Sequence, residues 1–60
     1  MHREKVVQEI KNCTVEELQA WKKHVLFCLK WFEKDQNHHE VDECKFLLKH
    51  IEEELNRTKQ

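Results

Sequence analysis

The stretch TVEELQAWKKHVLFCLKWF, residues 14–32, decides the fold of this 60-residue chain. Thr14 is followed three residues later by Glu17, and this pair can form a capping box, in which each side chain bonds the other residue's main-chain N–H. From Leu18 onward, apolar residues recur at alternating spacings of three and four, which is the period of one face of an α-helix. The stretch therefore predicts a long helix over residues 15–34.

A second long helix is predicted over residues 38–57. It follows a polar break, DQNHH, in which Asn37 can take a left-handed conformation or cap the next helix. Apolar residues in the second helix repeat with the same alternating spacing, so each long helix carries a heptad seam. The seam residues are Leu18, Trp21, Val25, Cys28 and Phe32 in the first long helix, and Val41, Cys44, Leu48, Ile51 and Leu55 in the second.

The composition supports a helical fold throughout. Gly and Pro are both absent, which argues against hairpin turns and most sheet architectures. The remaining residues are rich in Glu, Lys and Leu, which are good helix formers. We predict an all-α fold in which the two long helices form an antiparallel helical hairpin. A short N-terminal helix within residues 1–13 completes a single small domain over residues 1–60.

The first long helix carries more apolar surface than one neighbouring helix can cover. At about 100° per residue its apolar arc approaches about 200°, whereas a packed helix covers about 100°. Exposed apolar patches with large aromatic residues usually mark interaction sites. We therefore predict that two copies pair into a dimeric four-helix-bundle-like assembly. The residues predicted to mediate self-association are Ala20, Phe27, Trp31 and Leu47.

A second set of residues is predicted to bind another protein, because these residues are outward-facing and either apolar or basic. They are Leu26, Lys30, Lys34 and Phe46. The predicted function is that of a protein–protein interaction module acting as a regulator, inhibitor or adaptor. No motif in the chain is specific to one protein family, so the sequence does not name the partner.

Two other function classes remain open. A dimer could bind nucleic acid through its lysine faces, although a net charge of −1 does not favour phosphate binding. A thiol or metal sensor built on Cys28 and Cys44 is a weaker alternative. Zinc binding by His24, Cys28, Cys44 and His50 is disfavoured, because Cys44 and His50 point about 240° apart on their helix. No metal or other cofactor is predicted.

Catalysis and membrane insertion find no support in the sequence. The chain has no Ser, no Tyr and no Gly-rich loop, and no nucleophile with an orienting partner is visible. It has no apolar run of about 18 residues, and its N-terminal segment MHREKVVQEI is too charged for a signal peptide. A non-enzymatic cytoplasmic protein is therefore predicted, with its three cysteines as free thiols.

Overall fold

Residues 3–58 form three α-helices in this computed structural model of the protein. Helix α1 spans Arg3–Asn12, α2 spans Val15–Lys34 and α3 spans His38–Thr58. No strand occurs in this described part of the chain, so the prediction of an all-α protein is confirmed.

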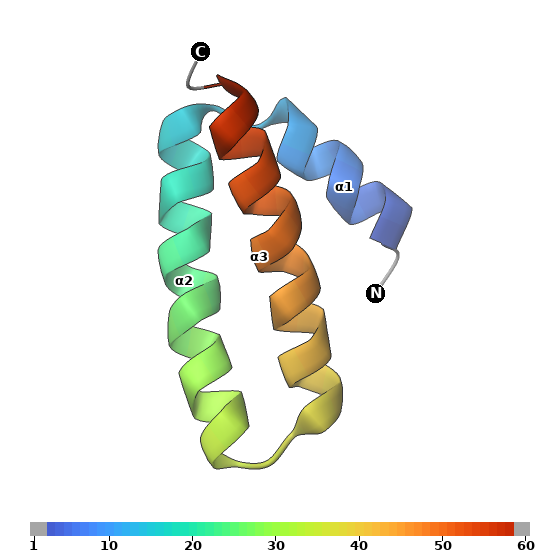
Figure 1. The fold of residues 1–60 in the computed structure, drawn as a ribbon, viewed down its shortest axis with the longest axis vertical. Helices are drawn as coiled ribbons and strands as arrows, with labels where there is room; N and C mark the ends of the chain where they lie inside the picture. The colour runs from blue at the N-terminus through green and yellow to red at the C-terminus, as the bar shows by residue number, and fades with distance from the viewer. Residues whose placement is uncertain (1–2, 59–60) are drawn as a thin grey trace.

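The three helices lie with α3 between the other two (Figure 1). Helices α2 and α3 run side by side in opposite directions, and α1 packs against the other side of α3. Residues 1–2 and 59–60, which the predicted domain includes, lie outside the described residues.

The capping box predicted at the start of α2 is present. Thr14 has an extended backbone, and its Oγ1 accepts a hydrogen bond from the Glu17 main-chain N at 3.1 Å. In return, the Glu17 Oε1 accepts from the Thr14 main-chain N at 2.9 Å. Two amides that the first helical turn leaves without intrahelical partners are thus satisfied.

The turn between α2 and α3 closes through main-chain hydrogen bonds. The Asn37 N donates to the Phe32 O at 2.9 Å, and the Gln36 N donates to the Glu33 O at 3.1 Å. This pair of bonds is the Schellman arrangement, which places one residue in the left-handed region. That residue is Gln36, with φ of 58°, and not Asn37. Asn37 instead lies at the cap position just before α3, since its main-chain O accepts from the Val41 N at 3.0 Å.

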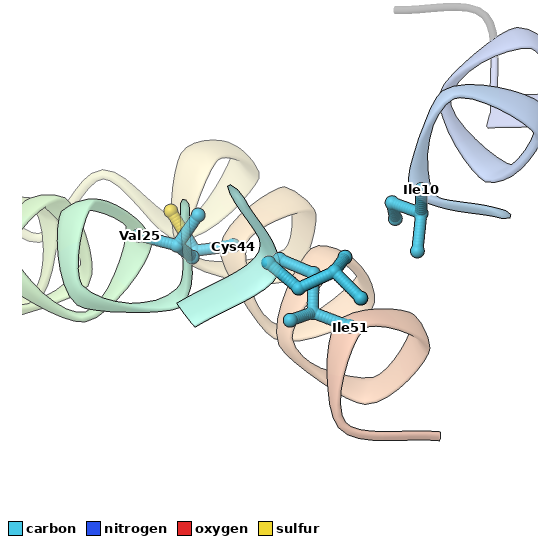
Figure 2. Close-up of a cluster of buried hydrophobic side chains, with 5 residues drawn as sticks. Ile10, Val25, Cys44 and Ile51 are labelled. Carbon is cyan, nitrogen blue, oxygen red and sulfur yellow. The ribbon is translucent and has the colours of Figure 1, made fainter. Parts of the chain in front are cut away.

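The core lies between α2 and α3 and is formed mainly by the predicted seam residues. Leu18 and Ile51 are fully buried, and Val25 lies beside Cys44 across the two helices (Figure 2). Burying such side chains contributes about 1.5–3 kcal/mol each. The half-buried seam residues packed against this cluster are Trp21, Cys28, Phe32, Leu48 and Leu55.

Helix α1 docks on α3 through both of its ends. Near its C-terminal end, Ile10 is buried and belongs to the same cluster as Ile51 (Figure 2). In its first turn, the Arg3 guanidinium lies 4.5 Å from the ring centroid of Phe46, and its Nη2 donates to the Glu43 Oε1 at 3.4 Å. Phe46, predicted to face outward, is therefore half-buried beneath α1. A ten-residue helix would be marginal alone in water, and these contacts hold it.

Candidate interaction surface

The largest exposed aromatic side chains lie together on α2. Phe27 is 62% exposed and Trp31 is 49% exposed. Their ring centroids are 6.1 Å apart with an interplanar angle of 61°, which is the edge-to-face arrangement that aromatic pairs favour. His24 and Ala20, about one and two turns before Phe27 on the same side, are also exposed. We call Ala20, His24, Phe27 and Trp31 the outer stripe.

The outer stripe faces away from the core. At about 100° per residue, Phe27 lies about 160° around α2 from the buried Val25. Neither α3 nor α1 covers Phe27 or Trp31. The members of the stripe are separated by four, three and four residues, so α2 carries a second heptad seam that the described fold leaves open.

Charge is distributed unevenly along α2. The first turn holds Glu16 and Glu17, and the last turn holds Lys34. The Lys34 Nζ lies 5.3 Å from the Trp31 ring centroid, close enough for a cation–π contact. Lys30 is exposed beside the stripe, one turn before Lys34. The outer face of α2 is therefore acidic at its N-terminal end and basic at its C-terminal end.

The structure brings three of the four predicted self-association residues together and separates the fourth. Ala20, Phe27 and Trp31 share the outer face of α2, whereas Leu47 lies on α3, half-buried against the core. Leu47 is thus a packing residue within the described fold, and its role in self-association stays a prediction.

The predicted partner-binding residues do not form one surface. Leu26 is 45% exposed and borders a shallow groove between α2 and α3, beside the Lys22–Glu52 ion pair of 3.8 Å. Lys30 and Lys34 lie closer to the outer stripe, and Phe46 lies under Arg3 on the far side of α3. A partner could therefore reach Leu26 and Phe46 only from different sides.

A cluster that sequence reasoning missed joins α1 to α3. Its members are Arg3, Glu43 and Phe46, with the His50 ring 4.5 Å from the Phe46 ring. The Glu43 Oε2 is buried and has no hydrogen-bond partner. The only local signal was that Glu43 and Phe46, three residues apart, share one side of α3. His50 therefore lies on the α1 side of α3.

The three cysteines are free thiols in different surroundings. Burial raises the pKa of Cys44, with further contributions from Cys28, Glu40 and Glu43. The Cys13 Sγ donates to the Glu9 O at 3.1 Å, and burial followed by the charges of Glu17 and Glu9 raises the pKa of this thiol. Raised pKa values make thiols less nucleophilic at neutral pH.

Cys28 has a different neighbour. Its Sγ lies 3.5 Å from the Nε2 of His24, one helical turn earlier. Within residues 3–58, no group of three or more His, Cys, Asp or Glu side chains is arranged to hold a metal ion. The single chain therefore offers a two-residue pair here, and not a complete metal site.

Comparison with protein-family models, curated proteins and solved structures finds no match to this chain. Among the described residues, none of the helices combines the length and the apolar character that crossing a membrane requires. The surfaces of the chain itself are therefore the basis for inferring its function.

Proposed function

We propose that this chain is a helical protein–protein interaction module that self-associates through the outer stripe. As a homodimer it acts as a cytoplasmic regulator, inhibitor or adaptor that presents its remaining surface to a protein partner. The observation that carries the proposal is the adjacent, exposed pair Phe27 and Trp31 on a helix face that α1 and α3 leave uncovered. Large aromatic side chains dominate the energetics of protein interfaces.

A second copy of α2 fits this stripe when the two helices run antiparallel. Heptad seams pack against each other. The four–three–four spacing of the stripe is the same from either end of the helix, so it matches a second copy that runs in the opposite direction. In antiparallel register, Ala20 faces Trp31 of the second copy, and His24 faces Phe27 of the second copy. The small Ala20 side chain leaves room for the large indole, so the two surfaces are complementary in size.

The distribution of charge along α2 also favours antiparallel pairing of the two helices. Antiparallel pairing in this register brings the first turn of one copy beside the last turn of the other, with Glu17 opposite Lys34 of the second copy. Parallel pairing would place like charges side by side, which is destabilising. Charge complementarity therefore supports a second copy of this chain, in antiparallel orientation, as the occupant of the stripe.

The proposed dimer joins four long helices with the two α2 helices at its centre. Leu26 lies about 100° around α2 from Phe27, so it stays outside this interface. The groove between α2 and α3 that Leu26 borders is then the surface that remains for a protein partner. This arrangement separates self-association from partner binding on the same helix.

Sedimentation equilibrium tests the proposal directly. The wild-type chain should have twice its monomer mass of 7.5 kDa, and the Phe27→Glu/Trp31→Glu variant should be a helical monomer. Leu26→Glu is the matched control, because it places the same charge on an exposed position of the same helix outside the stripe. It should remain a dimer. A wild-type chain that is monomeric at millimolar concentration, or a double variant that stays dimeric, would overturn the proposal.

A further inference from the structure

The pair His24 and Cys28 has the geometry of half a zinc site. Two ligand atoms on a tetrahedral zinc, at about 2.1 Å for His nitrogen and about 2.3 Å for Cys sulfur, are about 3.6 Å apart. The His24 Nε2 and the Cys28 Sγ are 3.5 Å apart. The two side chains are thus already separated by the distance that one ion requires, on a rigid helix that sets their spacing.

The other two cysteines are placed differently. Cys44 lies buried in the core, and Cys13 donates its thiol proton to a main-chain oxygen in the preceding turn of α1. Cys28 is half-buried at the edge of the outer stripe, and His24 is exposed within it. These two ligands therefore lie next to the proposed dimer interface, where a second copy can approach them.

From this placement we propose that two copies of the chain share one Zn²⁺ ion through His24 and Cys28 of each copy. The inference rests on the proposed self-association, because a single chain supplies only two ligands. In the antiparallel register, these residues lie within about one helical turn of the twofold axis in both copies. Together they form a Cys₂His₂ set, which zinc binds tetrahedrally.

Zinc binding at this site couples dimerisation to thiol ionisation. Each Cys28 binds as a thiolate and releases its proton to solvent, while each His24 binds as the neutral imidazole. Two thiolates neutralise the charge of the ion, so the closed site adds no net charge to the interface. Because the ion binds only the dimer with four ligands, zinc lowers the concentration at which the chain dimerises.

Cobalt titration followed by sedimentation tests the inference, since Co²⁺ in a tetrahedral thiolate site absorbs visible light and shows a sulfur-to-metal charge-transfer band. We expect one Co²⁺ ion for every two chains, displacement of Co²⁺ by Zn²⁺, and tighter dimerisation with metal than with a chelator. Cys28→Ser and His24→Ala should lose the charge-transfer band. Cys13→Ser and His39→Ala, which change the same residue types elsewhere, should keep it. Circular dichroism verifies that each variant is folded.

The outcomes separate this inference from the proposed function. A dimer that binds no Co²⁺, or a chain that binds one ion per monomer without a change in mass, overturns the zinc site and leaves self-association standing. A chain that stays monomeric with and without metal overturns both. A Co²⁺ spectrum that survives Cys28→Ser also overturns the zinc site, because another thiol then holds the ion.

Discussion

The guanidinium of Arg3 lies 4.5 Å from the ring centroid of Phe46 and joins the first turn of α1 to the middle of α3. The same guanidinium pairs with Glu43 at 3.4 Å. These contacts direct the short N-terminal helix to α3 and away from α2. The additional apolar surface of α2, centred on Phe27 and Trp31, therefore remains exposed to solvent.

Replacing Arg3 should loosen α1 without unfolding the rest of the chain. Arg3→Ala removes the cation–π contact and the ion pair, which together contribute about 1 kcal/mol at a half-exposed site. It also leaves the partly buried Glu43 carboxylate without this cation. Hydrogen exchange should show faster exchange of α1 amides, while α2 and α3 keep their protection. Lys5→Ala, on the same helix, is the control, and equal effects of the two changes would contradict this role of Arg3.

Replacing Gln36 by Gly should stabilise the protein. Gln36 has a φ of 58°, a conformation that costs a residue with a Cβ about 1–2 kcal/mol and that Gly adopts readily. We expect Gln36→Gly to raise the melting temperature by roughly 4–8 °C for each kcal/mol gained. Asn37→Gly is the control and should not raise it, because Asn37 lies at the cap position before α3 and not in the left-handed region. Thermal melts by circular dichroism provide the comparison, and a lower melting temperature for Gln36→Gly would refute the prediction.

The buried thiol of Cys44 should make stability fall at alkaline pH. Its folded-state pKa is raised above the ordinary value of 9.0, first by burial. The unfolded chain therefore loses this proton at lower pH than the folded chain does. The contribution of the thiol is complete below about pH 9 and declines as the pH rises toward the folded-state pKa.

Urea unfolding of the wild type and Cys44→Ala at pH 7.5 and pH 9.5 measures this effect. The advantage of the wild type over the variant should be smaller at the higher pH. In the native Cys13→Ser/Cys28→Ser variant, Cys44 should also react with a thiol reagent much more slowly than in denaturant. An advantage that grows with pH would mean that the folded protein stabilises the thiolate, contrary to the assigned burial.

Exchanging charges on α2 should test the antiparallel orientation of the proposed dimer. Glu17→Lys and Lys34→Glu should each weaken dimerisation, because each places like charges opposite one another in the second copy. The double variant restores opposite charges across the interface and should recover most of the lost affinity. Sedimentation at several salt concentrations should show the difference shrinking as salt rises. Failure of the double variant to recover would exclude this register.

The helices themselves were predictable because their signals are local. The Thr14–Glu17 capping box lies within four residues, and the seams repeat at every turn. The residue in the left-handed region was harder to assign, because Asn adopts that conformation more readily than Gln does. Its position is set by the last hydrogen bonds of α2, which place Gln36 at the site that follows the C-cap.

The surroundings of the candidate site depend on contacts between distant parts of the chain. Arg3 and Glu43 are 40 residues apart, and no local sequence pattern predicts that they form an ion pair. Without that contact, a helical wheel cannot show that α1 covers Phe46. Phe27 and Trp31 could be identified from the sequence because their helical spacing alone places them off the heptad seam of α2.

The most direct test of self-association through α2 is a nuclear Overhauser measurement between the Ala20 methyl group and the Trp31 indole. Within one α2 helix these residues are about 16 Å apart at a rise of about 1.5 Å per residue, too far for a signal. In the proposed dimer they face each other across the interface. An intermolecular Ala20–Trp31 signal in a mixture of isotope-labelled and unlabelled chains is the predicted result. A dimer whose intermolecular signals arise from other surfaces, with none from Ala20 or Trp31, would contradict the account.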